Sequence, residues 1–184
     1  MTYEEIDNMV KKCRKCGMLL KPRFYTFKQG KSNILIIGES PAKDGWIESG
    51  KAFYNDKGTL QGTGRILSRL LELIGLTIED ISFTECCKCH LDNITTLSEF
   101  TANCRPFLIS QLELSKQEII LTMGKFATQQ ILGIEIKRFK DYAGKEFKYG
   151  NKIVIPIYHC SPINPLGYSG NVEIFKSLTK YNLH

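Results

Sequence analysis

The stretch that decides the fold reads Asn33-Ile34-Leu35-Ile36-Ile37-Gly38-Glu39-Ser40-Pro41-Ala42-Lys43-Asp44-Gly45. Its apolar run predicts a strand that is buried on both faces. The strand ends in a polar loop, where Gly38 permits unusual backbone angles and Pro41 fixes its own φ. Ligands of open parallel α/β sheets bind just outside the carboxyl ends of the strands, so we expect the functional site in this loop.

Further apolar runs alternate with helical patterns along the rest of the chain. This alternation predicts an α/β fold, a three-layer αβα domain with a central four-stranded parallel sheet and right-handed crossovers. The ends of the strands then bring Gly38-Glu39, Glu85, Gly124 and His159 to one crevice. In the basic segment 134–149 we expect a hairpin around Gly144. Besides the opening strand, we predict strands at 81–87, 118–124 and 152–158 and helices at 3–12, 66–74, 97–114, 125–132 and 169–181.

The composition fits one domain that covers residues 1–184. The chain has no apolar run of membrane-spanning length, and its first residues do not form a signal peptide, so we expect a cytoplasmic protein without membrane contact. It carries no oligomerisation motif, which predicts a monomer. The net charge of +6 fits a polyanionic partner and a solvated lysine-rich surface equally well.

Seven cysteines in such a chain indicate metal ligation or plain burial, because an odd number does not form a closed disulfide framework. Cys13 and Cys16 have the Cys-x-x-Cys spacing of metal ligands. Cys89 and Cys104 complete a set of four from distant segments, which suits an iron–sulfur cluster, although the spacing does not exclude zinc. Cys86 and Cys87 are alternatives to Cys89, but their strand-like surroundings favour small core residues. A buried packed thiol is also the preferred interpretation of Cys160.

Several short motifs occur in an order that resembles one known family. Over residues 13 to about 162, the chain resembles the iron–sulfur uracil-DNA glycosylases, the family 4 branch of that superfamily. No single motif is specific, but their ordered combination is. The motifs are Cys13-x-x-Cys16, Ile-Ile-Gly-Glu-Ser-Pro41, Gly-Lys-Ala-Phe53, Thr-Glu-Cys-Cys-Lys-Cys89, Cys104 and His159-Cys-Ser161.

The resemblance implies a DNA glycosylase of base excision repair. Such an enzyme flips a damaged base, uracil or a related deaminated or modified base, out of DNA and hydrolyses its N-glycosidic bond. Phe53 corresponds to the aromatic residue that stacks on the flipped base. Ser40 and Glu85 line the same base pocket. The resemblance also implies a structural [4Fe–4S] cluster held by Cys13, Cys16, Cys89 and Cys104.

Cleavage of the glycosidic bond develops positive charge on the sugar and negative charge on the leaving base. Asp44 is our preferred carboxylate for the sugar or for the attacking water, with Glu39 and Glu48 as alternatives. His159, neutral and donating one N–H group, serves the departing base. A satisfied core histidine is the alternative interpretation, but the position of His159 at a strand end beside Ser161 favours function.

The segment after His159 is expected to contact DNA. Ser161 and Pro162 repeat the Ser-Pro device of the opening loop, which suits phosphate contacts as well as plain turn chemistry. Leu166 or Ile163 would fill the gap that the flipped base leaves in the stack. At the start of the predicted helix, Gln61-Gly-Thr-Gly-Arg65 presents free main-chain N–H groups that favour an anion.

The chain departs from the family pattern in three places. Cys160 replaces the proline of the usual His-Pro-Ser motif, and the segment 51–65 is longer than usual. The family has asparagine where this chain has Glu85, and a carboxylate accepts hydrogen bonds but does not donate them unless it is protonated. Glu85 is therefore protonated in a dry pocket, selects a base with two donors, or turns away to pair with Lys88.

Two rival functions stay open at this point. A non-catalytic iron–sulfur nucleic-acid-binding protein would share the fold and the cluster. A zinc-stabilised hydrolase of small nucleosides is the third possibility, and metal analysis separates it from the other two.

Overall fold

The protein is described by a computed structural model that covers residues 1–16, 25–90 and 97–184, with the main chain alone at positions 43 and 44. Its strands form a five-stranded sheet in the order β2-β1-β3-β5-β4. The strands β1 (Ile34–Gly38), β2 (Ser82–Glu85), β3 (Ile119–Met123) and β5 (Lys152–Ile157) run parallel. The predicted four-stranded parallel sheet is confirmed, and β4 (Phe147–Tyr149) extends it as an antiparallel edge strand.

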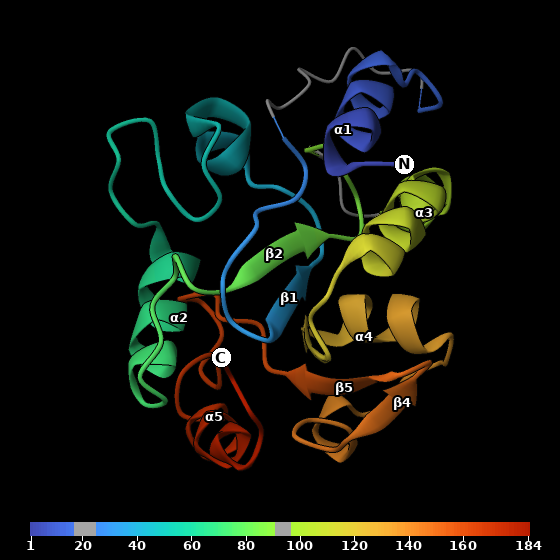
Figure 1. Cartoon of the computed structure of the whole chain (residues 1–184). Helices are drawn as coiled ribbons and strands as arrows, with labels where there is room; N and C mark the ends of the chain where they lie inside the picture. The colour runs from blue at the N-terminus through green and yellow to red at the C-terminus, as the bar shows by residue number, and fades with distance from the viewer. Residues whose placement is uncertain (17–24, 91–96) are drawn as a thin grey trace.

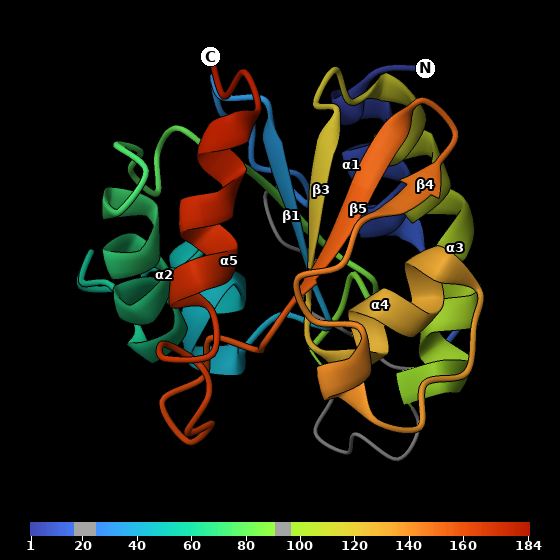
Figure 2. The ribbon, with the colours of Figure 1, turned by 90° about the horizontal axis from the view of Figure 1, so that it is seen from below.

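Helices cover both faces of this sheet and complete the three layers (Figure 1). Figure 2 shows α1, α3 and α4 on one side of the strands and α2 and α5 on the other. These helices are α1 (Tyr3–Lys12), α2 (Gly62–Glu72), α3 (Leu97–Leu114), α4 (Lys125–Leu132) and α5 (Val172–Ser177). Shorter helical turns are η1 (Lys43–Ile47), η3 (Phe139–Asp141) and η4 (Leu178–Lys180).

The opening strand supplies both layers of the core, because successive side chains of a strand point to opposite faces. Ile34 and Ile36 pack into the cluster that contains residues of α2 and α5. Leu35 and Ile37 pack into the cluster that contains residues of α3 and α4. All four side chains have no solvent exposure, as the unbroken apolar run predicts.

The hairpin predicted around Gly144 is wrong, since β4 and β5 turn at residues 150 and 151. Gly150 has a φ of 59°, the left-handed conformation that two-residue hairpin turns require. Gly144 also has a positive φ, 76°, but it follows η3 and its N–H donates to the carbonyl of Pro156. Both glycines mark turns, and strand pairing decides which of them closes the hairpin.

The last predicted helix is shorter than expected. Residues 165–170 form turns, α5 begins at Val172, and the chain continues into η4. In the part of the chain that the structure describes, no helix combines the length and the apolar character needed to cross a membrane.

Candidate active site

A cavity of about 300 Å³ lies at the carboxyl ends of the parallel strands. Glu39 and Ser40 enter it from the loop after β1, Glu85 from the end of β2, and His159 from the segment after β5. Phe53 forms part of its wall. The structure therefore brings together five residues that the sequence singled out, from segments that lie up to about 120 positions apart. Parallel strands make this possible because their carboxyl ends share one edge of the sheet.

The structure does not place the other two carboxylate candidates, Asp44 and Glu48, in the lining of the cavity. Asp44 belongs to η1, but its side chain lies outside the described part of the structure. Glu48 follows η1, is exposed and does not line the cavity.

Phe53 is held in a conformation that few residues with a side chain adopt. Its φ is 71°, in the left-handed region. The Phe53 carbonyl accepts a hydrogen bond of 2.8 Å from the Gln61 N–H, and its ring centroid lies 4.3 Å from that of Phe83. A Cβ on Gly64 would lie 3.0 Å from the Cβ and the carbonyl oxygen of Phe53, so a larger residue there would press on Phe53. Strained residues of this kind cluster at ligand sites, which fits an aromatic wall held for a base.

Glu39 and His159 share a low-polarity environment. Burial raises the pKa of the Glu39 carboxyl above its usual 4.5. Burial also lowers the pKa of His159 below 6.5, which keeps the imidazole neutral at physiological pH. His159 lies over Gly124, where an added Cβ would be 3.4 Å from the His159 Cβ. The cavity therefore holds a neutral imidazole and a carboxyl whose pKa is raised by burial.

Glu85 lies directly beside the opening strand, in register with Gly38. Its side chain is buried and lines the cavity. Lys88 donates from Nζ to the Glu85 main-chain oxygen over 2.6 Å and to Gln111 Oε1 over 2.6 Å. Lys88 therefore holds the carbonyl of Glu85, while Glu85 itself belongs to the lining of the cavity, which favours the two interpretations in which its side chain faces the pocket.

His90 also lines the cavity, and the sequence analysis missed it. Its Nδ1 lies 3.0 Å from the main-chain oxygen of Pro41, in the loop after β1. The signal that could have found it is its position directly after Cys89, close to the end of β2. That signal is weak, because neighbourhood in the sequence does not show which way a side chain points.

Ser161, Pro162 and Leu166 lie on a loop beside the cavity and are not part of its lining. In this loop Ile163 is 92% exposed and Leu166 is 43% exposed. Asn164 donates from Nδ2 to the His159 carbonyl over 2.8 Å, which ties the loop to the histidine. Gly62, at the start of α2, lets Pro162 approach, since a Cβ there would be 2.3 Å from Pro162 Cγ.

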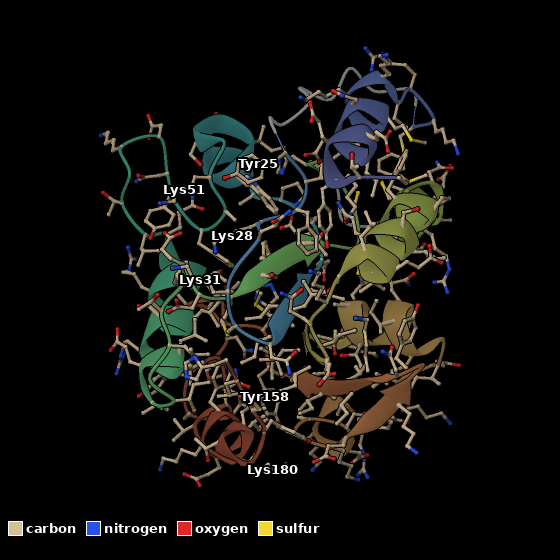
Figure 3. The ribbon with its side chains drawn as sticks, viewed as in Figure 1. Tyr25, Lys28, Lys31, Lys51, Tyr158 and Lys180 are labelled. Carbon is tan, nitrogen blue, oxygen red and sulfur yellow. The ribbon has the colours of Figure 1, made fainter. Side chains whose placement is uncertain are left out.

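The long segment 51–65 is folded onto the molecule. Tyr54 and Leu60 form an antiparallel bridge, and Asn55 Oδ1 accepts main-chain N–H groups inside the turn. Glu79 anchors this turn, because its Oε1 lies 3.0 Å from Lys51 Nζ and 3.0 Å from Tyr54 OH. Figure 3 labels Lys51 together with Lys28, near the β2 edge of the sheet.

A second, smaller cavity of about 20 Å³ is lined by Cys13, Cys16, Cys89 and Cys104. Cys13 follows α1, whose first turn is held by a capping box between Thr2 and Glu5. The four thiols come from three distant segments, as expected for the predicted set. Among the residues that the structure describes, no group of three His, Cys, Asp or Glu side chains is arranged to hold a single metal ion.

Hydrogen-bond donors point at two of these sulfur atoms. The Lys88 main-chain N–H donates to Cys104 Sγ over 3.3 Å, and Asn103 Nδ2 donates to Cys16 Sγ over 3.5 Å. Such donors stabilise thiolate ligands, so the residues fit a metal–sulfur group. Cys86 and Cys160 are fully buried in apolar clusters, in line with core residues. Cys87 is buried too, but it packs in a small cluster with Cys104.

Comparison with known proteins agrees with this geometry. Residues 24–178 match the model of the uracil DNA glycosylase superfamily. The chain therefore belongs to the uracil DNA glycosylase superfamily.

Curated relatives narrow the assignment within the superfamily. The type-4 uracil-DNA glycosylase of Archaeoglobus fulgidus is 30% identical over 169 residues, which cover 85% of this chain and 81% of the relative. That of Saccharolobus solfataricus is 31% identical over 165 residues, with 84% and 73% covered. That of Sulfurisphaera tokodaii is 29% identical over 170 residues, with 86% and 74% covered. Within the superfamily, the chain falls in the type-4 branch.

Proposed function

We propose that this protein is a DNA glycosylase that acts in base excision repair and removes a damaged base from DNA. The observation that carries the proposal is the cavity in which Glu39, Phe53, Glu85 and His159 meet, in a chain of the type-4 branch. A base inside duplex DNA cannot reach such a cavity, so it would be flipped out of the stack. DNA is accordingly the proposed partner, and the net charge of +6 favours binding to its phosphates.

In this proposal the flipped base lies against the ring of Phe53, and Ser40 and Glu85 contact its polar atoms. His159 donates an N–H group to the base as negative charge develops on it. The lowered pKa of His159 supports this role, since a neutral imidazole leaves the pocket without an added charge in the ground state. Asp44 or Glu39 stabilises the positive charge on the sugar or orients the attacking water.

The loop beside the cavity is proposed to hold the DNA. Ser161 and Pro162 would lie against the phosphates that flank the flipped nucleotide. Ile163 and Leu166 are exposed apolar side chains on this loop, and they are suited to fill the gap in the base stack. The N-terminus of α2 packs against Pro162 and would face the same backbone.

We further propose that Cys13, Cys16, Cys89 and Cys104 hold a [4Fe–4S] cluster. The chemistry of four thiols around one cavity, with donors directed at Cys16 and Cys104, supports it. The cluster would cross-link the segment after α1 to α3 and to the segment after β2, and no redox step of the base excision depends on it.

The proposal also covers the cellular compartment and the oligomeric state. None of the seven cysteines, all of which the structure describes, forms a disulfide, and we propose a protein of the reducing cytosol. Because the sequence carries no oligomerisation motif, we also propose that the protein is a monomer.

The test is an excision assay on duplex and single-stranded oligonucleotides that carry one uracil, hypoxanthine, xanthine or oxidised base. We expect abasic sites from at least one of them, and loss of that product in His159→Ala. Purified protein that retains its iron but yields no abasic site on any substrate would refute the glycosylase. Binding to damaged DNA that persists in His159→Ala, without product from either protein, would favour the non-catalytic alternative. Colourless protein that contains zinc would refute the cluster.

A further inference from the structure

The side chain of His90 joins two segments that line the active-site cavity. His90 is half-buried and lines this cavity together with Ser40 and Pro41 of the loop after β1. Its Nδ1 lies 3.0 Å from the main-chain oxygen of Pro41. A carbonyl oxygen accepts hydrogen bonds and does not donate them, so Nδ1 carries the hydrogen of this bond. The imidazole is therefore a donor that holds this part of the loop.

Main-chain hydrogen bonds hold the start of the same loop. Cys86 donates its N–H to the Gly38 carbonyl over 3.0 Å, and Cys87 donates to the Glu39 carbonyl over 2.9 Å. The His90 side chain adds a further hydrogen bond between these two segments, farther along the loop. The segment after β2 thus holds the loop after β1 with main-chain groups first and with an imidazole beyond them.

Pro41 is the point at which this side chain holds the loop. Proline has no N–H group and fixes its own φ, so the buried Pro41 can be held through its carbonyl. Glu39 and Ser40 lie directly before it, and both line the cavity. Because the carbonyls of Glu39 and Pro41 are both held, a displacement of Pro41 would carry these two side chains with it.

The main chain that carries His90 is itself fixed by Lys88, two residues before it. Lys88 is buried, and its Nζ donates over 2.6 Å to the Glu85 carbonyl and over 2.6 Å to Gln111 Oε1. Its main-chain N–H donates to Cys104 Sγ over 3.3 Å. A donor places its acceptor only when its own support is rigid, and these contacts supply that support.

We propose that His90 is a positioning residue for base excision: its Nδ1–H group holds the Pro41 carbonyl and thereby sets where Glu39 and Ser40 face the base. This inference deepens the proposed function and rests on it. A displacement of about 1 Å at a reacting group costs on the order of 10²-fold in rate, so one hydrogen bond at the edge of the cavity is enough to matter. His90 acts through the loop, so its loss should lower kcat more than it changes the KM for DNA.

Asparagine and glutamine distinguish the two ring nitrogens of His90. The amide nitrogen of asparagine lies two bonds from Cβ, as Nδ1 of histidine does, and that of glutamine lies three bonds from Cβ, as Nε2 does. His90→Asn therefore retains a donor for Pro41, whereas His90→Gln and His90→Leu lose it. His184→Leu, the same change at an exposed histidine, is the matched control.

The first readout is the quenching of tryptophan fluorescence by acrylamide. Trp46 is the one tryptophan of the chain, is buried, and lines the cavity five positions after Pro41. We expect the quenching constant to rise about twofold in His90→Leu and His90→Gln as the loop loosens, and to keep its wild-type value in His90→Asn and His184→Leu. No nucleic acid is present, so this result does not depend on whether the protein is a glycosylase.

The second readout is excision from the oligonucleotide on which the wild type is fastest, with iron content and circular dichroism as checks of folding. We expect kcat to fall about 10- to 100-fold in His90→Gln and His90→Leu, with KM changed less than about threefold, and His90→Asn to stay within about threefold of wild type. With an active wild type, equal kcat in His90→Asn and His90→Gln would overturn the proposal, and so would wild-type quenching in His90→Leu. The expected quenching pattern without excision by any of the proteins would count against the glycosylase and leave the hold of His90 on the loop supported.

Discussion

Asn171 braces the loop that carries His159, and its replacement should cost much of the protein's stability. The side chain is fully buried. Its Oδ1 accepts the Tyr158 N–H over 2.8 Å, and its Nδ2 donates over 2.9 Å to each of the carbonyls of Tyr158 and Gly167. Figure 3 labels Tyr158, the residue that precedes His159. One amide thus joins both ends of the loop 158–167.

Asn171→Leu keeps the size of the side chain and removes these three hydrogen bonds, together with a weaker one of 3.7 Å from Nδ2 to Cys160 Sγ. Each main-chain group that is left buried without a partner costs ~1–3 kcal/mol. Tyr158 is only partly buried, so we expect the lower end for each group and a total loss of about 3 kcal/mol in the free energy of unfolding. This is a large fraction of the ~5–15 kcal/mol that stabilises a typical domain. Asn171→Asp retains the acceptor for the Tyr158 N–H but turns its second oxygen toward two carbonyl oxygens in a buried site, so it should be destabilising as well.

Urea unfolding followed by tryptophan fluorescence measures the effect, since the chain has one tryptophan, Trp46, and it is buried. With a slope of ~2 kcal/mol/M, the midpoint should fall by about 1.5 M. The control is Asn8→Leu on the exposed surface of α1, which should change stability by less than about 0.5 kcal/mol. A loss of under about 1 kcal/mol in Asn171→Leu would refute the reasoning that this amide holds the loop.

Three other predictions concern the two cavities. Cys104→Ser should purify with most of its iron missing and with lower thermal stability, whereas the control Cys86→Ala should keep its iron. Metal analysis measures the iron content, and equal iron in both variants would contradict the proposed ligand set. Burial raises the pKa of Glu39 above 4.5, so the excision rate should begin to fall at a higher pH than it would with an exposed carboxyl. This fall of the rate at acidic pH should disappear in Glu39→Gln. An unchanged pH–rate profile would exclude an ionised Glu39 from the reaction. Burial lowers the pKa of His159, so its contribution to stability is present above pH 6.5 and is lost as the pH falls toward the lowered value. Thermal melts between pH 7.5 and 5 should therefore show a smaller loss in His159→Gln than in wild type, and parallel curves would speak against a buried neutral histidine.

Much of the fold could be predicted from local patterns. The run from Ile34 to Ile37 is apolar at every position and β-rich, which favours a strand covered on both faces, and the structure places these side chains in the clusters on both sides of the sheet. The alternation of such runs with helical segments then required a parallel sheet with helices on both sides. The turn at Gly150 was missed, because a glycine shows where a chain can turn but not which strands pair across the turn.

Some residues of the candidate site could also be predicted from the sequence, and others could not. Glu39 and His159 could be predicted as site residues because each follows a predicted strand, and Phe53 because of the resemblance to the glycosylases. The place of His90 in the cavity could not be predicted, because its contact with Pro41 joins positions that lie 49 residues apart.

Glu85 shows most clearly what each level of structure decided. The sequence by itself determined that a carboxylate stands where the family has an amide, and it left three interpretations open: a protonated carboxyl, selection of a base with two donors, or a side chain that turns away to Lys88. Only the tertiary structure placed Glu85 in the lining of the cavity. The physical reason is the parallel pairing of Gly38 with Glu85, which leaves free space beside a residue that has no side chain, together with the Lys88 ammonium bound to the Glu85 carbonyl.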